Sequence, residues 1–201
     1  MAKGNIKTTA LSEEQLVAII SVMKEGCSLF RPNKKIATAL MLEANLGMRI
    51  SDIVSLKLSN IVMDGNRYRL DIKERKTGKE RTFTVSQSIY CYIMEYVADN
   101  GIKKNEYLFP HSDKNRGKPI TTAAIQKHLR TICDYLGYGE LKISTHSFRK
   151  FYATRIYEKN NYDIVLVQRL LQHSSPSVTQ RYIGMGSKNL ETAIEKNAFL
   201  V

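Results

Sequence analysis

The chain has 201 residues, of which 43% are hydrophobic and 25% are charged, a composition typical of one ordinary globular domain. No apolar run approaches the ~18 residues of a membrane-spanning helix, and the N-terminus MAKGNIKTT lacks the apolar stretch of a secretory signal. Lys and Arg total 31 against 19 Asp and Glu, and this net charge of +12 favours a polyanionic partner such as nucleic acid over the alternative of a basic protein without one.

Helical signals dominate the beginning of the chain. Residues 1–10 have the composition of a flexible lead-in or linker. Ser12 and Gln15 then form a capping box ahead of apolar residues at helical spacing, which predicts a first helix. A second helix is predicted over about residues 34–46, and it ends at Gly47, because glycine is favoured just past helix C-termini.

The period of the pattern then changes from helix to strand. After a short predicted helix around residues 53–56, apolar and charged residues alternate over residues 67–73, as in a half-buried strand. A turn separates it from a partner strand over residues 82–85. The Asp64-Gly65-Asn66 turn signal adds a third predicted strand over residues 58–63.

Helical spacing returns in the second half of the chain. Residues 103–119 read as a polar loop. The helices are predicted over about residues 86–98, 122–136, 145–159, 163–172, 176–182 and 187–198. The expected fold class is therefore mainly α with a small antiparallel three-stranded β-sheet (α+β), and no internal domain boundary is evident.

Cysteine and histidine spacing argues against a metal site. Cys27, Cys91 and Cys133 are far apart and form no CxxC pair, so we expect buried free thiols in a reducing compartment. The four histidines never pair at i, i+3 or i, i+4, and no glycine-rich phosphate loop is present. We therefore predict no cofactor and no metal.

Several polar residues are left unexplained by local structure, and each taken singly is compatible with a structural or solvated role. Together they suggest phosphodiester chemistry. Arginines can clamp the non-bridging oxygens, a lysine or histidine can protonate the departing sugar oxygen, and a tyrosine hydroxyl can attack phosphorus. The residues are Arg49, Lys76, His146, Arg149, His173 and Tyr182.

These residues lie in stretches that resemble the motifs of a known family, the tyrosine recombinases or phage integrase family. The stretches are Gly47–Asp52, Glu74–Lys79, Thr145–Arg149 and Leu170–His173, with Tyr182 nine residues after the last histidine. Each motif alone is weak, but their order and predicted structural settings make a specific signal over nearly the whole chain. The resemblance implies the tyrosine recombinase catalytic-domain fold, that of the DNA breaking-rejoining enzymes.

The resemblance also implies a role for each residue. Arg49 and Arg149 would bind the scissile phosphate, and His146 would assist proton transfer. Lys76, on the β-hairpin, would be the general acid for the leaving 5′ oxygen. Asp52 would be a supporting carboxylate that orients its neighbours.

The remaining two residues complete the implied chemistry. His173 would hydrogen-bond the phosphate, and Tyr182 would attack it to give a 3′-phosphotyrosyl DNA link and a free 5′ hydroxyl. The implied enzyme is a tyrosine-type site-specific DNA recombinase (integrase) that rejoins strands without ATP. The alternatives are type IB topoisomerase-like DNA relaxation and a non-catalytic DNA-binding module.

The chain departs from the family pattern in three places. Gln172 stands where glycine is common, and Phe148 replaces a common leucine. The N-terminal core-binding domain of the family is expected to be absent from this chain, which is then either an excised catalytic domain or a minimal recombinase-like protein. We expect a lead-in over residues 1–10 and a catalytic domain over residues 11–186.

The partners follow from the same resemblance. Residues 187–201 would form a C-terminal helix that docks either on a neighbouring protomer or on its own core. Arg181 would contact DNA or, as we favour, only solvate its helix. The expected partners are double-stranded DNA and further copies of the chain, as a homo-oligomer (tetramer) on DNA or a monomer in isolation, with no membrane. The expected location is the cytoplasm, associated with the nucleoid.

Overall fold

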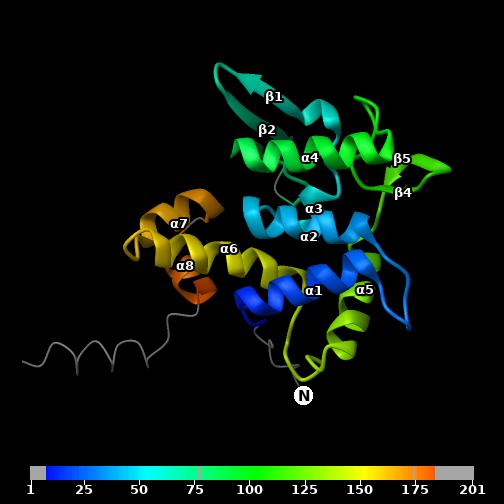
Figure 1. Ribbon diagram of the computed structural model, residues 1–201. Coiled ribbons are helices and arrows are strands. Elements are labelled where there is room, and N and C mark those ends of the chain that lie inside the picture. The colour runs from blue at the N-terminus through cyan, green and yellow to red at the C-terminus, as the bar shows by residue number, and fades with distance from the viewer. Residues whose placement is uncertain (1–7, 77, 174, 184–201) are drawn as a thin grey trace, which may run out of the picture. The chain divides into compact units, whose positions relative to one another are not determined.

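The computed structural model describes residues 8–76, 78–173 and 175–183, which belong to two compact units (Figure 1). The first unit runs to Tyr152 and the second begins at Ala153. The boundary falls inside the helix α6 (Thr145–Lys159), where the sequence carries no linker signal. Within the described ranges, no helix is both long enough and apolar enough to cross a bilayer.

The first two helices form as their sequence patterns predict. Helix α1 (Glu13–Glu25) begins at the capping box, in which the Gln15 amide donates to Ser12 Oγ at 3.2 Å and the Ser12 amide donates to Gln15 Oε1 at 3.0 Å. Helix α2 (Lys34–Leu46) ends at Gly47, which adopts left-handed backbone angles with φ 61°. Glycine reaches this conformation without the strain that a Cβ would add, so the chain turns sharply here.

The short helix α3 (Ile50–Ile53) begins earlier than the apolar cluster that predicted it. Its first turn is set by the Arg49 carbonyl, which accepts from the Asp52 and Ile53 amides at 2.9 and 3.1 Å. Leu56, which we expected inside the helix, follows its end and is buried in the core. Arg49 is thereby fixed at the start of a helix.

The three-stranded antiparallel sheet is confirmed, with the order β1 (Ile61–Asp64), β2 (Arg67–Lys73), β3 (Glu80–Val85). The strand expected over residues 58–63 starts only at Ile61. Residues 58–60 instead make a turn of 3-10 helix, in which Asn60 Oδ1 accepts from the Lys57 amide at 2.8 Å. Leu70 of β2 pairs with Ile61 and Phe83 and is fully buried, which fixes the inner face of the sheet.

A second, two-stranded sheet lies where we expected only a polar loop, so that prediction was wrong. Strands β4 (Pro110–Ser112) and β5 (Asn115–Pro119) form an antiparallel hairpin. Phe109, just before β4, is fully buried, and its carbonyl accepts from the Ile120 amide at 2.8 Å. The hairpin is thus tied down at its base, while its own strands lack the alternating apolar residues by which strands are recognised.

The remaining helices of the first unit are α4 (Gln87–Asn100) and α5 (Thr122–Tyr135), capped by Ser86 and Thr121. In Figure 1, α4 lies between the three-stranded sheet and α2, while α1 packs on α2 and on α5. The core between these layers includes the fully buried side chains Ile36, Leu40, Ile53, Ile93, Phe109 and Phe148. The expected mainly α class with small antiparallel sheets is confirmed.

The second unit contains the last part of α6, then α7 (Ile164–Leu171) and α8 (Pro176–Ile183), which pack on each other. Asp163 caps α7 by accepting from the Val165 and Leu166 amides, both at 2.9 Å. The predicted helix over residues 187–198 lies outside the described residues.

The three cysteines are free thiols, but only one of them is buried as expected. Cys133 is buried in α5, Cys27 is half-buried, and Cys91 is exposed on α4. Burial raises the pKa of the Cys133 thiol to about 11, so this group is an inert part of the core.

Candidate active site

A hollow of about 420 Å³ in the first unit, which we call the Arg49 hollow, is built from the starts of helices. The first turns of α5 and α6 open onto it, together with the start of α3 and the tip of the β2–β3 hairpin. Amide groups in the first turn of a helix lack intrahelical partners, and the helix dipole makes this end positive. Such a site favours an anion. The lining residues are Arg49, Ile50, Ser51, Lys76, Thr122, Ala123, Gln126, Thr145 and His146.

Arg49 is held by a carboxylate that our sequence reasoning did not single out. Arg49 Nη1 donates to Glu74 Oε1 at 2.7 Å, and Arg81 Nε lies 3.1 Å from the same oxygen. Glu74 is only 4% exposed, while Arg49 keeps 22% of its side chain accessible. Glu74 thus orients Arg49 while leaving part of the guanidinium open to a ligand. The available signal was a carboxylate within the motif stretch Glu74–Lys79 of a basic hairpin.

Asp52 fastens the hairpin that carries Lys76. Its Oδ1 accepts from the Arg75 amide at 3.0 Å, beside the turn in which the Gly78 amide donates to the Glu74 carbonyl at 2.8 Å. Burial raises the pKa of Asp52, the Arg75 amide opposes this shift, and Glu74 adds to it. Lys76 itself is exposed and lines the Arg49 hollow.

His146 and Arg149 lie one turn apart on α6. The helix start is fixed by the Thr145 amide, which donates to Gln126 Oε1 of α5 at 3.2 Å. His146 is exposed, yet partial desolvation lowers its pKa, and the charges of Arg149, Arg49 and two lysines lower it further. A histidine with a lowered pKa is neutral near pH 7 and able to accept a proton.

Arg149 is only 4% exposed, whereas His146, one turn earlier on the same helix, is exposed. It does not line the Arg49 hollow, but it lies close enough to His146, Asp52 and Glu43 to influence the pKa of each. Phe148 beside it is fully buried in the core, so the replacement of the leucine common in the family is a matter of packing.

His173 and Tyr182 lie together in the second unit. Their rings meet edge to face, with centroids 5.2 Å apart and planes at 75°. His173 Nδ1 is 3.0 Å from Thr179 Oγ1, and the His173 carbonyl accepts from Gln168 Nε2 at 3.3 Å. The histidine is therefore fixed by α7 on one side and α8 on the other, with the tyrosine against its ring.

Gln172, just before this histidine, has left-handed backbone angles with φ 55° and ψ 44° at the end of α7. For an L-residue other than glycine this conformation costs about 1–2 kcal/mol. The preference of the family for glycine here thus has a backbone cause, and the departure at Gln172 concerns stability and not the chemistry of His173.

The six residues predicted to act in catalysis fall into two groups. In the first unit, Arg49, Lys76 and His146 surround one hollow, with Arg149 one turn behind His146. The second group is His173 with Tyr182 in the second unit. That the two groups form one centre is part of the proposal below.

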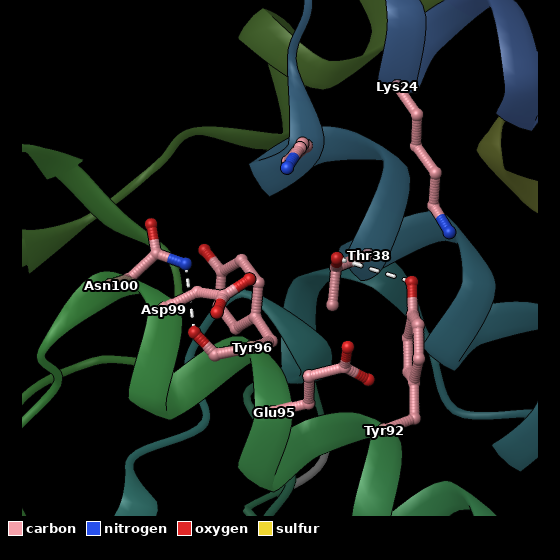
Figure 2. A pocket seen from close by; sticks show the side chains of 8 residues that line it. Lys24, Thr38, Tyr92, Glu95, Tyr96, Asp99 and Asn100 are labelled. Atoms are coloured by element: carbon pink, nitrogen blue, oxygen red, sulfur yellow. Dashed lines mark hydrogen bonds between the residues drawn. The ribbon is translucent and has the colours of Figure 1, made fainter.

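A larger hollow of about 500 Å³ lies between α2 and α4 and contains none of the predicted site residues (Figure 2). There Thr38 Oγ1 and Tyr92 Oη are 3.3 Å apart, and Lys24 Nζ lies 5.3 Å from the centre of the Tyr92 ring. Two lysines and two carboxylates line it, so their charges cancel. It is therefore a poor site for a phosphate, and the Arg49 hollow is the better candidate.

Comparison with known proteins shows the family and the fold of the chain. The model of the phage integrase family matches residues 9–187. The chain belongs to the phage integrase family. Two relatives are the probable integrase/recombinase YoeC of Bacillus subtilis, 36% identical over 165 residues, and the tyrosine recombinase XerA of Pyrococcus furiosus, 28% identical over 189 residues. These alignments cover 82% and 93% of this chain, and 86% and 61% of the relatives.

A solved structure of a site-specific recombinase has the same fold as this chain. The XerH site-specific recombinase, solved in a pre-cleavage complex with its difH substrate, superposes with a TM-score of 0.67 at 23% identity. The match covers 96% of this chain and 56% of the XerH chain. The chain thus spans little more than half of some relatives, and it has the fold of a tyrosine recombinase catalytic domain.

Proposed function

We propose that this chain cuts and rejoins double-stranded DNA at specific sites, as the catalytic domain of a tyrosine recombinase. The observation that carries the proposal is the Arg49 hollow, where Arg49, Lys76 and His146 meet at the starts of two long helices. Guanidinium and ammonium groups beside helix N-termini match the charge of a phosphodiester. Family membership supports the same reading.

The reaction is a transesterification at phosphorus. Tyr182 Oη attacks, its proton passes to a base such as neutral His146, and the bond from phosphorus to the 5′ oxygen breaks. Lys76 donates the proton that the leaving 5′ oxygen takes up. Arg49 and Arg149 neutralise the charge that gathers on the non-bridging oxygens.

His173 completes the proposed centre by hydrogen-bonding the phosphate from beside Tyr182, while Asp52 holds the hairpin of Lys76 in place. The phosphotyrosyl link conserves the energy of the broken bond, so a second strand with a free 5′ hydroxyl can replace the tyrosine in the reverse of the same step. No metal or cofactor takes part in the proposed reaction.

DNA is the proposed substrate because the chain carries a net charge of +12, and phosphate contacts dominate the affinity of DNA-binding proteins. The structure of the Tn1549 transposon integrase, which has a similar fold, was solved in complex with a circular intermediate DNA, which supports the same class of partner. We further propose assembly of a homo-oligomer, a tetramer, on DNA, with residues 187–201 docking on a neighbouring protomer. The proposed location is the cytoplasm, at the nucleoid.

A nicked suicide substrate tests the proposal. Cleavage near the nick releases a short fragment, so rejoining fails and the covalent protein–DNA adduct accumulates. Wild-type protein should give an adduct stable to denaturation, and Tyr182→Phe should give none. Tyr162→Phe is the control, because Tyr162 is an exposed tyrosine of the same unit. An adduct of undiminished yield with Tyr182→Phe would overturn the assignment.

The same assay separates the competing functions. If adduct formation needs no defined sequence and supercoiled plasmid is relaxed, the chain acts as a type IB topoisomerase. If DNA binds but no adduct forms, and binding survives alanine at Arg49, Arg149 and Tyr182, the chain is a non-catalytic DNA-binding module.

A further inference from the structure

Arg81 is an arginine in an otherwise apolar row of strand β3. Side chains of a strand alternate between its two faces, so Arg81 shares a face of β3 with Phe83 and Val85. Val85 is buried, and Phe83 packs against the core. The Arg81 side chain is itself only 11% exposed. Because burying a charge is costly unless the charge is paired, a specific partner must account for an arginine at this position.

The partner of Arg81 is the carboxylate that also holds Arg49. Glu74 Oε1 lies 3.1 Å from Arg81 Nε, and the same oxygen accepts from Arg49 Nη1 at 2.7 Å. Within the described residues, the contact with Glu74 is the one ion pair of Arg81. Glu74 is only 4% exposed, so solvent screens these attractions weakly. Two guanidinium groups therefore share one carboxylate oxygen, and the three groups together carry one positive charge.

Glu74 also shapes the loop of Lys76 through its backbone. The Glu74 amide donates to the Lys79 carbonyl at 2.9 Å, and the Glu74 carbonyl accepts from the Gly78 amide at 2.8 Å. The same residue thus orients one proposed phosphate-binding arginine by its side chain and closes the loop of the proposed general acid by its backbone. Because Arg81 follows this loop on β3, its ion pair with Glu74 links the two sides of the hairpin.

We propose that Arg81 is a positioning residue that preserves the positive charge of the proposed phosphate site. If Glu74 paired with Arg49 alone, the two charges would cancel and a phosphodiester would gain little by approaching. Because Arg81 supplies a second positive charge to the same oxygen, Glu74 can orient Arg49 while the site still attracts the phosphate. Arg81 lies outside the set of described residues that line the Arg49 hollow, so it acts through Glu74. This inference rests on the proposed function and explains how its site keeps its charge.

Single-turnover adduct formation on the suicide substrate tests the proposal with two variants of Arg81. Arg81→Met keeps an apolar stem and removes the charge, and it should slow adduct formation by about 10- to 100-fold, the effect of one charge acting over several ångströms. Arg81→Lys keeps the charge and should restore the rate to within about fivefold of wild type. A role in packing alone would not distinguish the two variants in this way.

Arg69→Met is the matched control for the loss of one charge. Arg69 belongs to the same sheet, but it pairs across the strands with Thr84 and therefore lies on the opposite face from Arg81. Its ion pairs are with Asp64 and Asp71. Adduct formation by Arg69→Met should stay within about twofold of wild type, because solvent screens an exposed charge. Equal losses for Arg69→Met and Arg81→Met would show that the contact with Glu74 is not the cause.

A charge-balanced double variant separates charge from structure. Glu74→Gln in the Arg81→Met background restores one net positive charge, and the glutamine oxygen can still accept from Arg49. The double variant should therefore form adduct at least about fivefold faster than Arg81→Met alone. If Arg81 had only a structural role, the second substitution would add its own loss and the double variant would be slower.

Urea unfolding establishes which variants are folded under the assay conditions. The double variant lacks both charges of the pair and should fold even if Arg81→Met does not, because removing one partner of a buried ion pair costs more than replacing both. If Arg81→Met is unfolded, the double variant is compared with wild type and should stay within about tenfold of its rate. A larger loss would overturn the proposal.

Three results with folded protein would also overturn the proposal. They are wild-type rates for Arg81→Met, no gain for Arg81→Lys over Arg81→Met, and a double variant no faster than Arg81→Met. Failure of the proposed function looks different, since wild-type protein would then form no adduct at all.

Discussion

Gly47 and Tyr152 are in such close contact that no side chain fits between them. A Cβ on Gly47 would lie 2.4 Å from Cδ1 and 2.5 Å from Cε1 of the Tyr152 ring. Gly47 also has φ 61°, so two independent constraints exclude other residues. This contact joins the end of α2 to α6. Arg49 comes two residues after Gly47, and Arg149 comes three residues before Tyr152. The glycine of the motif therefore serves the spacing of the two arginines.

Gly47→Ala should destabilise the protein by about 3 kcal/mol, from left-handed strain and from overlap with the ring. Urea unfolding measures this. Gly101→Ala is the control, because Gly101 has φ 58° but open space around its Cβ position. It should cost only about 1 kcal/mol. Equal costs at the two glycines would mean that the contact with Tyr152 adds nothing.

Lys76→Ala should abolish adduct formation on an ordinary phosphodiester but not on one with sulfur at the 5′ bridging position. A thiolate leaves without a proton, since thiols have a pKa of about 8.5, so the general acid becomes unnecessary. Lys79→Ala, at the same exposed hairpin tip, should cleave both substrates. Slow cleavage of the sulfur substrate by Lys76→Ala would show that Lys76 is not the acid.

The lowered pKa of His146 has a consequence for stability. The unfolded chain, with a histidine pKa of about 6.5, takes up a proton before the folded chain does as pH falls. Wild-type protein should therefore lose stability relative to His146→Gln as pH falls from about 6.5 through the folded pKa, and show no such difference above that range. Urea unfolding of both proteins across this window measures it. Parallel curves would contradict the lowered pKa.

Gln172→Gly should raise the free energy of unfolding by about 1 kcal/mol, because glycine relieves the left-handed strain at φ 55°. Thermal unfolding should shift upward by about 2–4 °C for a chain of this size. Gln172→Ala keeps a Cβ and should leave the midpoint near that of wild type. A lower midpoint for the glycine variant would mean that the Gln172 side chain contributes more than the strain costs.

Helices and their ends were predictable because their signals are local. The capping box at Ser12 and the glycines at 47 and 101 each set a boundary within a few residues. The β4–β5 hairpin was not predictable, because it is held at its base by the burial of Phe109 and by Arg116, which bonds Glu106 and the carbonyls of Asn100 and Gly101. Those partners are separated in sequence.

In the candidate site, too, residues with a local signal could be predicted, and residues whose role depends on distant contacts could not. Arg49, Lys76, His146 and Arg149 could be predicted as a set because phosphoryl transfer requires those residue types and because their stretches resemble motifs of the family. The carboxylate beside Arg49, Glu74, was not singled out, because its role depends on which guanidinium the fold brings near.

The central claim is that Tyr182 becomes covalently attached to DNA, and peptide mapping of the trapped adduct tests it most directly. After digestion of protein and DNA, mass spectrometry should find one nucleotide joined through its 3′ phosphate to the tyrosine of the peptide containing Tyr182. Attachment at any other residue, or through a 5′ phosphate, would contradict the account.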